Sequence, residues 1–527
     1  MSGDNRGMFG VVREDATSAD GSGIYIGSIL NTFGIDFRAR AYTGTSATSS
    51  SGSELFDKTD FDTGDIGLLC FDIDNGKLWF GRRDVSGSST IWYDSSGNNN
   101  GDPSAGSNPT YTGTYTGHTW FIGCHDYNGT TIVANFGQDG SFAGSLTSQG
   151  ASDAGGIGDF NYIESGFLAL CTSNMPDITI GPGQDSQADD HFNTVLYTGN
   201  GSTQNITGVG FQPDWTWIKN RAATDAHALT DSVRGVTKEI QTNALSAEST
   251  NADGLTAFGA DGFSLGDDDI YNTNAEGYVS WNWKAGTSFS NDASATSVGT
   301  IDSTGTVNTD AGFAIISYTG TGSAGTIAHG LGTVPKFYVV KNRGDSGTNW
   351  QAYHGAAASD PETDYLYLNS SAALDDADDW NDTAPTSSVF SVKTHNQVNE
   401  SGDTYIAYLF SEIEGYSKFG SYVGNGNANG MFVYTGFRPA WIMVKEVGAS
   451  GFWMIQDNKI YPINDGDTRS LAANDTATES TISGRGNEMD ILSNGFKMRA
   501  STGDFNASNT HVYLAFAEQP FKFANAR

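Results

Sequence analysis

An internal repeat is the feature that most constrains how this chain can fold. Three segments open with a Tyr-x-Gly-x-Gly stretch and then reach a run in which a lysine follows a proline by six residues. The opening tyrosines are Tyr197, Tyr318 and Tyr422, and the runs are 213–219, 335–341 and 439–445. Each segment closes with an aromatic run that starts at Tyr278, Tyr405 or His511. Matching ends around variable middles indicate three homologous modules, because loops tolerate insertions that core strands do not.

The proline-to-lysine runs predict buried central strands. In the first run Trp215 and Trp217 would lie on one face and Ile218 on the other, so both faces are apolar. The proline fits at the strand entrance, where no ladder N–H is needed. Trp441 and its counterparts Trp215 and Phe337 are therefore expected in the core. With the closing aromatic strand, each module is expected to be an antiparallel sandwich of roughly 100 residues.

Composition favours many short strands joined by tight turns. The chain has 67 glycines, and Ser, Thr, Asn and Asp fill the stretches between apolar runs. Acidic residues outnumber basic ones by 61 to 27, a net charge of −34 that disfavours binding to nucleic acid and to anionic membranes. No stretch approaches the roughly 20 apolar residues of a membrane span. Residues 1–6 carry no apolar signal core, so synthesis in the cytoplasm without a signal peptide is predicted.

Three cysteines are too few, and odd in number, for a disulfide framework. Cys70, Cys124 and Cys171 each lie in an apolar run. We expect all three to be small buried side chains of a protein made in a reducing compartment.

A strand–turn–strand pattern dominates the N-terminal segment. Two apolar stretches, 64–72 and 77–80, flank Asn75-Gly76, a strong hairpin signal. Together with 10–14, 25–27 and 133–137, this hairpin resembles the SPRY domain, a concanavalin-like β-sandwich. The resemblance implies strands ahead of residue 10 for which this chain starts too late. Either the N-terminus is truncated or a neighbouring chain supplies them.

The repeats carry a second resemblance. With endings such as 415–422 and 520–527, they are similar to a β-domain found in structural and tail-fibre-like proteins of marine bacteriophages. Those proteins often carry a SPRY-like module ahead of the repeats, so the resemblance covers nearly the whole chain. It implies a virion structural protein, made in the host cytoplasm, that is fibre-like or decorates the particle.

The expected fold class is all-β, a SPRY-like jelly-roll sandwich followed by three homologous antiparallel β-sandwich modules. The close spacing near residues 412–420 predicts that the last two modules are docked together. The expected divisions are a sandwich at 1–180, a linker at 181–191, module 1 at 192–287, a linker at 288–310, module 2 at 311–415 and module 3 at 416–527.

The sequence contains short matches to catalytic and cofactor-binding motifs, but the residues around each match do not fit the corresponding site. The segment 320–325 matches G-x-G-x-x-G, but the residues after it are no helix start, and a dinucleotide site needs one there. The Gly76-Lys77 pair is followed by Leu78 and so forms no P-loop. His118 and His125 lack the partners of a zinc site. We expect no enzyme activity, no cofactor and no metal centre. The sequence leaves one alternative, an active site assembled from residues of several loops.

Two charged features have alternative interpretations. The acidic stretches 267–269, 375–379 and 464–467 lack EF-hand spacing, so solvated loops are favoured and calcium binding is left open. Lys219, Lys341 and Lys445 end the three buried runs. We expect each to pair with an acidic loop or to extend its ammonium group past the strand end, with ligand contact as the lesser alternative.

Loop aromatics are the best candidates for a ligand site. Trp92 and Tyr93 are followed by a polar stretch that includes Asn98. These three residues are predicted to bind a sugar, with the rings stacking on its face.

The predicted function is that of a bacteriophage virion protein that contacts other virion proteins or host surface glycans as part of a homo-oligomer, for which a trimer is the guess. It binds neither nucleic acid nor membrane. A cellular secreted or surface glycan-binding protein, a lectin-like adhesin, is the alternative from another class. A hydrolase on a lectin-like scaffold is a third, weaker alternative.

Overall fold

The computed structural model has an almost entirely β architecture in two compact units, 1–176 and 177–527. The predicted division after residue 180 falls four residues later than the division between these units. The residues that the structure describes are 7–13, 26, 32–36, 41–43, 53–56, 61–62, 64–84, 89–116, 120–125, 132–171, 174, 178–181, 184–462, 464, 469–481, 489–501 and 503–520.

The first unit contains two antiparallel sheets. One has the order β4-β3-β2-β1-β9, and the other joins β5, β6, β7 and β8. Val11 and Ile35 of the first sheet pack against Leu78 and Phe80 of the second in one buried cluster. The strands are β1 (Met8–Arg13), β2 (Thr32–Asp36), β3 (Ala41–Thr43), β4 (Ser53–Phe56), β5 (Ile66–Asp72), β6 (Lys77–Arg83), β7 (Thr90–Trp92), β8 (Tyr111–Thr112) and β9 (Trp120–His125).

The predicted hairpin lies between β5 and β6. Asp72 pairs with Lys77, and the Asp72 carboxylate accepts a hydrogen bond from the backbone N–H of Asn75 at 3.1 Å. Gly76 has φ +66°, a conformation that glycine adopts without strain. The prediction for the cysteines holds only in part. Cys70 is buried in β5, but Cys124 in β9 is exposed and Cys171 is only partly buried, because an apolar run in the sequence does not decide which face of the chain is covered.

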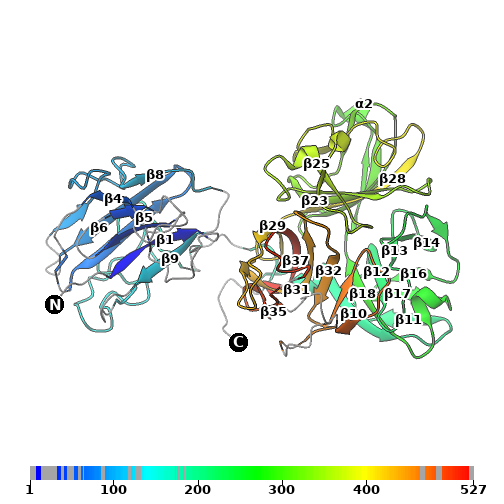
Figure 1. The fold of residues 1–527 in the computed structure, drawn as a ribbon, viewed down its shortest axis with the longest axis horizontal. Helices are drawn as coiled ribbons and strands as arrows, with labels where there is room; N and C mark the ends of the chain where they lie inside the picture. The colour runs from blue at the N-terminus through cyan, green and yellow to red at the C-terminus, as the bar shows by residue number, and fades with distance from the viewer. Residues whose placement is uncertain are drawn as a thin grey trace. The chain divides into compact units, whose positions relative to one another are not determined.

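The second unit consists of three modules with one strand order. Module 1 comprises β10 to β18, module 2 β19 to β28 and module 3 β29 to β37. Their large sheets share the order β10-β18-β12-β13-β14-β15, β21-β28-β23-β24-β25-β26 and β29-β37-β31-β32-β33-β34. The smaller sheets are β11-β17-β16, β22-β27 and β30-β36-β35. The repeat found in the sequence is therefore a repeat of topology (Figure 1).

The bounds of these elements follow the chain. Module 1 has β10 (Phe192–Thr198), β11 (Gln204–Thr207), β12 (Trp215–Asn220), β13 (Ala228–Asp231), β14 (Lys238–Gln241), β15 (Ser249–Thr250), β16 (Leu255–Gly259), β17 (Gly262–Leu265), α1 (Asp269–Asn272) and β18 (Gly277–Trp283). Module 2 has β19 (Thr287–Asn291), α2 (Ala293–Thr296), β20 (Ser303–Asn308), β21 (Phe313–Thr319), β22 (Gly325–Ala328), β23 (Pro335–Asn342), β24 (Trp350–His354), η3 (Pro361–Thr363), β25 (Asp364–Tyr367), β26 (Asp375–Asp376), η4 (Asp378–Trp380), β27 (Val389–Val392) and β28 (Thr404–Ser411). Module 3 has β29 (Ser417–Val423), β30 (Phe432–Tyr434), β31 (Phe437–Glu446), β32 (Trp453–Asp457), β33 (Arg469–Ala472), β34 (Ser480–Thr481), β35 (Met489–Leu492), β36 (Gly495–Met498) and β37 (Thr510–Pro520).

The Tyr-x-Gly-x-Gly motif has a geometric cause. Its first glycine lies so close to a backbone carbonyl of another loop that a Cβ would clash with it. Its second glycine has φ of +64°, +68° or +60° in the three modules, a region that disfavours other residues. The opening aromatic ring stacks on the ring that opens the closing strand. The stacked pairs are Tyr197 with Tyr278 at 5.1 Å, Tyr318 with Tyr405 at 5.1 Å and Tyr422 with His511 at 5.0 Å between ring centroids.

The segments expected to be linkers are built into the second unit. The range 181–191 contains the short helix η2 (Ala188–Asp190), and Ala188 is fully buried. The range 288–310 holds most of the β19–β20 hairpin, whose second strand pairs with β21 and so widens the large sheet of module 2. Their polar composition suggested linkers, but edge strands with one solvated face are polar too.

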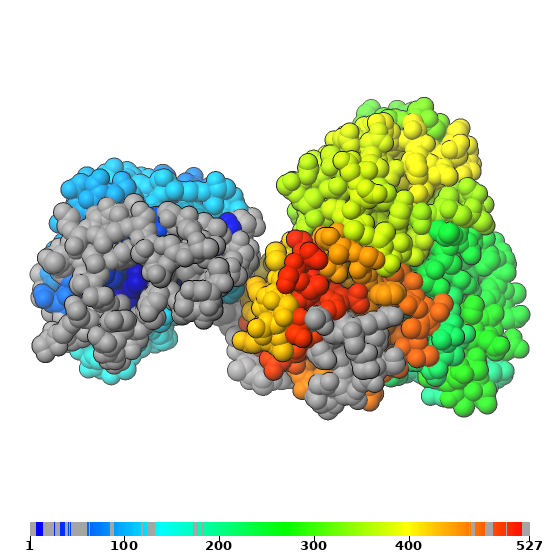
Figure 2. Space-filling view, viewed as in Figure 1, coloured from blue at the N-terminus to red at the C-terminus, as the bar shows by residue number. Residues whose placement is uncertain are grey.

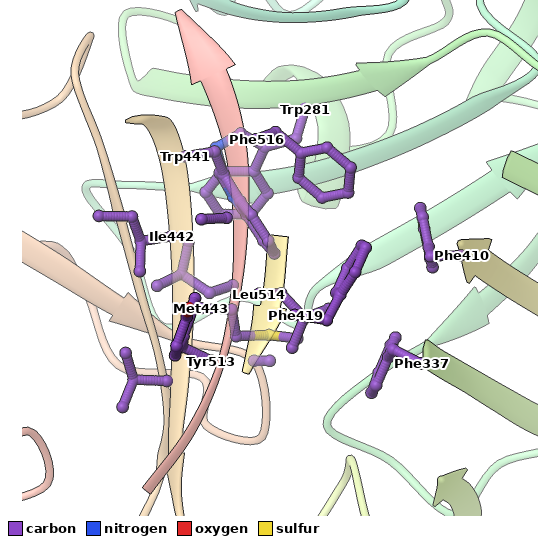
Figure 3. Close-up of a cluster of buried hydrophobic side chains, with 14 of the residues drawn as sticks. Trp281, Phe337, Phe410, Phe419, Trp441, Ile442, Met443, Tyr513, Leu514 and Phe516 are labelled. Carbon is purple, nitrogen blue, oxygen red and sulfur yellow. The ribbon is translucent and has the colours of Figure 1, made fainter. Parts of the chain in front are cut away.

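The three large sheets share one core. Trp215 of module 1 lies 4.6 Å from Tyr408 of module 2, and Trp283 of module 1 lies 5.7 Å from Trp441 of module 3, between ring centroids. Figure 3 shows the side chains of all three modules converging on this cluster. In the space-filling view the surfaces of the modules meet directly (Figure 2). Trp215, Phe337 and Trp441 are each at most 4% exposed, as predicted.

Candidate functional site

The structure places the predicted ligand residues in and beside the core of the first unit. Trp92 is 8% exposed, and its indole Nε1 donates a hydrogen bond to Glu164 Oε2 at 2.7 Å. Tyr93 is fully buried on the opposite face of the sheet. Asn98 is exposed, but its backbone and side-chain N–H groups donate to the carboxylate of Asp94 within a turn. Neither ring offers an open face to a sugar, which corrects the expectation for this site.

The acidic stretches have several separate roles. Asp268 accepts a hydrogen bond from the backbone N–H of Ile270 and so caps α1. Asp378 forms an ion pair with Lys393. Of the third stretch only Asn464 is described, and it accepts from the backbone N–H of Ile491. Within the described ranges, no three His, Cys, Asp or Glu side chains are grouped as a metal ion would require.

The ammonium groups of the three repeated lysines are buried and donate hydrogen bonds to backbone carbonyl oxygens. The Nζ atoms of Lys219, Lys341 and Lys445 donate to backbone carbonyl oxygens of Asn220, Thr348 and Glu446, each at 2.6 Å. Burial lowers the pKa of all three lysines to about 8. This arrangement corrects both expected alternatives, because each lysine is fully buried and its ammonium group is bound by backbone carbonyl oxygens rather than by an acidic side chain or solvent.

Loops between modules close the second unit into a ring. In each module, the loop after the fifth strand of the large sheet donates a backbone N–H to a backbone carbonyl of the next module. The accepting residue lies two positions after the repeated lysine of that module. The bonds run from Glu248 N to Arg343 O at 2.9 Å, from Leu374 N to Val447 O at 3.0 Å and from Glu479 N to Arg221 O at 2.9 Å. Module 1 thus contacts module 2, module 2 contacts module 3, and module 3 contacts module 1.

Side chains distinguish the three seams. The Arg343 guanidinium donates twice to Glu248, at 2.8 and 3.1 Å, and Arg221 forms an ion pair with Glu479. At the third seam Leu374 packs against the cluster that contains Val447. Two seams are therefore joined by ion pairs and one by apolar contact.

Module 2 departs from the common plan on the face of its large sheet that faces its own small sheet. Its small sheet has two strands, whereas those of modules 1 and 3 have three, and η4 takes the place in the chain of β35. Beside η4 lies a cluster of polar and aromatic side chains, partly buried and partly exposed, which we call the tyrosine face. It consists of Gln351, Tyr365, Tyr367, Asp375, Asp379, His395 and Gln397.

Two tyrosine rings form the centre of the tyrosine face. Tyr365 and Tyr367 alternate along β25, are half-buried, and have ring centroids 4.8 Å apart. The Tyr365 hydroxyl donates to Asp375 Oδ2 at 3.2 Å, and Gln397 Nε2 donates to the Tyr367 hydroxyl at 3.3 Å. The rings are thus held by polar partners at their tips while part of each ring stays exposed.

A buried carboxylate lies beside the rings. Asp379 is 3% exposed, accepts a hydrogen bond from the fully buried Gln351 and lies 3.4 Å from the half-exposed ring of His395. Burial raises the pKa of Asp379, and the neighbouring His395 opposes that rise. The Oε1 atoms of Gln351 and Gln397 accept no hydrogen bond from the described residues.

Sequence reasoning missed the tyrosine face, although a signal was present. By strand register, Gln351, Tyr365 and Tyr367 correspond to Met454, Ser470 and Ala472 of module 3, which are all buried. A column-by-column comparison of the repeats would have found tyrosines where a sister module has small residues. The comparison needs the strand register, because the middles of the repeats differ in length.

These observations define an all-β protein whose larger unit is a closed ring of three homologous modules. The chain belongs to the family described as a domain of unknown function, DUF7483, whose family model matches residues 187–520. That match spans all three modules as one domain, as the shared core requires. Searches of curated proteins and of solved structures returned no match. No helix among the described residues is long and apolar enough to cross a membrane.

Proposed function

We propose that this chain is a structural protein of a bacteriophage particle, fibre-like or surface-decorating, that acts by binding contact with host glycans or neighbouring virion proteins. The closed ring of three modules is the observation that carries the proposal. A ring with one shared core is a rigid platform, and rigid platforms with variable loops are suited to presenting binding surfaces. The first unit, as a two-sheet sandwich of the SPRY type, would add a second surface.

The sequence resemblance and the charge support the same role. Phage structural proteins are present in many copies, and a net charge of −34 keeps crowded copies soluble through mutual repulsion. Weak single contacts gain strength when many copies act together. A homo-oligomer, with the trimer as the first guess, therefore remains part of the proposal, and light scattering on the purified full-length chain tests it.

Immunoelectron microscopy of purified particles tests the virion role. Antibody against the full-length chain is expected to label particles at regular positions on the capsid or the tail. Labelling of the surface of uninfected cells, with none on particles, would contradict the proposal and identify the lectin-like adhesin instead.

A further inference from the structure

The partly exposed tyrosine rings offer a surface for a flat, partly apolar ligand. Tyr365 and Tyr367 are tilted by 53° to each other on one strand, with their hydroxyl tips held by Asp375 and Gln397. A ring held at its tip loses little freedom when a ligand packs on its face. The C–H face of a sugar ring is a ligand of this shape.

Hydrogen-bond acceptors dominate around the rings. Asp375 is exposed, while the Oε1 atoms of Gln351 and Gln397 are buried and accept no hydrogen bond from the described residues. The exposed carboxylate of Asp375 is the acceptor that a ligand can reach, so a ligand with hydroxyl or ammonium donors is favoured here. The hydroxyl groups around a sugar ring supply such donors, and the half-exposed His395 can bond to a further hydroxyl.

The charge of the region limits the kind of sugar. Burial raises the pKa of Asp364, and the nearby carboxylates of Asp360, Asp376, Asp375 and Glu362 raise it further. This local field repels a uronic or sialic acid and accepts a neutral or amino-bearing sugar. A basic peptide would meet the same carboxylates, so the experiment below separates it from a sugar.

Among the described residues of the three repeats, this arrangement occurs in module 2 alone. Equivalent positions in module 3 hold Met454, Ser470 and Ala472, which are buried. Module 1 places Glu239 and Gln241 there, and Gln241 donates to Glu239 at 2.7 Å. Because all three modules share one strand order with different residues at these positions, the fold does not need tyrosines there.

We propose that the tyrosine face binds a neutral or amino-bearing sugar of a glycan, with Tyr365 and Tyr367 stacking on the sugar ring and Asp375 and His395 bonding to its hydroxyl groups. This inference rests on the proposed function and names the site and ligand class through which host contact would occur.

A glycan microarray of neutral, amino-bearing and anionic glycans, probed with the full-length chain, gives the first test. The strongest-binding glycan is then titrated in free form by isothermal calorimetry. Replacing both rings by the module 3 residues, Tyr365→Ser with Tyr367→Ala, is expected to weaken its affinity at least tenfold. Gln397→Ile, which introduces the residue that module 1 has there, is expected to weaken it less.

The control is Tyr434→Ala, which removes another half-buried tyrosine, from β30 of module 3, and is expected to leave affinity unchanged. Circular dichroism confirms that each variant is folded. Binding to anionic glycans alone, or to none, overturns the inference, as does full affinity in the Tyr365→Ser/Tyr367→Ala chain. Binding of hexalysine that this double variant abolishes, without glycan binding, would assign the face to basic peptides instead. Particle labelling without glycan binding would contradict this inference and still support the virion role. Glycan binding without particle labelling would support this inference and contradict the virion role.

Discussion

Modules 2 and 3 share a strand order, but they differ on the face of the large sheet that faces the small sheet. In module 3 the small sheet has three strands, and Met454, Ser470 and Ala472 are buried. In module 2 the helix η4 replaces one strand, and Trp380 from this helix fills the core by packing edge-on against Tyr338 at 4.8 Å. The core is therefore completed in both modules, while at these positions module 2 has partly exposed tyrosine rings and module 3 has buried residues.

The difference separates positions that build the ring from positions that are free to change. The opening tyrosine and the two glycines after it keep the same contacts in both modules, and the lysine at the strand end donates to a backbone carbonyl oxygen in each. The fourth and fifth strands carry different side chains in the two modules. A repeat fold can thus change one surface without losing the contacts that hold its modules together.

The largest expected effect comes from breaking the core that the modules share. Trp441→Ala is expected to lower the free energy of unfolding of the second unit by about 3–5 kcal/mol, because it leaves a cavity next to Trp283 and Phe516. Urea denaturation of the full-length chain measures the loss. Val423→Ala, at a residue that is 57% exposed, is the control and should change stability by less than about 0.5 kcal/mol.

This substitution also tests whether the modules depend on one another. If they share one core, amide exchange in β23 of module 2 should speed up in the Trp441→Ala chain. A loss below about 1 kcal/mol, or an effect confined to module 3, would show that the modules fold separately.

The second test uses pH to ask whether the lysines of the modules are equivalent. The pKa of Lys219, Lys341 and Lys445 is lowered to about 8, so above that pH the unfolded chain binds more protons than the folded one. Stability should therefore rise between pH 8 and 9.5, by roughly 1 kcal/mol for each lysine. Above pH 10 the trend should reverse, because burial raises the pKa of tyrosines such as Tyr318 and Tyr408.

Urea denaturation at a series of pH values measures this slope. Lys341→Met should reduce it by about a third, whereas Lys336→Met, at an exposed lysine of the same strand, should leave it unchanged. A flat profile between pH 8 and 9.5 would argue against the burial of these ammonium groups.

The third test compares a seam joined by an ion pair with the apolar seam. A double-mutant cycle with Glu248→Ala and Arg343→Ala should give a coupling of about 1–2 kcal/mol, since the pair is bidentate and mostly buried. The coupling should shrink in 1 M salt. A cycle with Leu374→Ala and Val447→Ala serves as the control, and its coupling should not depend on salt.

The smallest effect on stability is expected where the modules differ most. Tyr365→Ser with Tyr367→Ala should lower the free energy of unfolding by about 1 kcal/mol or less, because both rings are half-exposed and the new residues already occupy these positions in module 3. Thermal unfolding of the full-length chain measures it. A loss above about 3 kcal/mol would mean that the rings belong to the core and that the tyrosine face is a structural feature.

Sequence reasoning reached the repeat, the central strands and the burial of Trp215, Phe337 and Trp441, because these depend on local patterns. It failed at Trp92 and Tyr93, where adjacent aromatic residues in a polar setting turned out to lie on two faces of a sheet. Side-chain direction in a strand alternates with every residue, and the extent of β7 was not evident from composition alone.

The shared core and the tyrosine face, by contrast, required the tertiary structure. Trp281 donates to Asp457 across 176 residues, and Tyr408 donates to Asp231 across 177, and neither pair leaves a trace in local spacing. Residues 351, 367 and 379 meet only because strand pairing sets their register. The alternation of apolar and turn residues determines where strands form, since it acts over a few residues. Which faces meet depends on burying the remaining apolar faces, and three such faces can be buried together only in a ring.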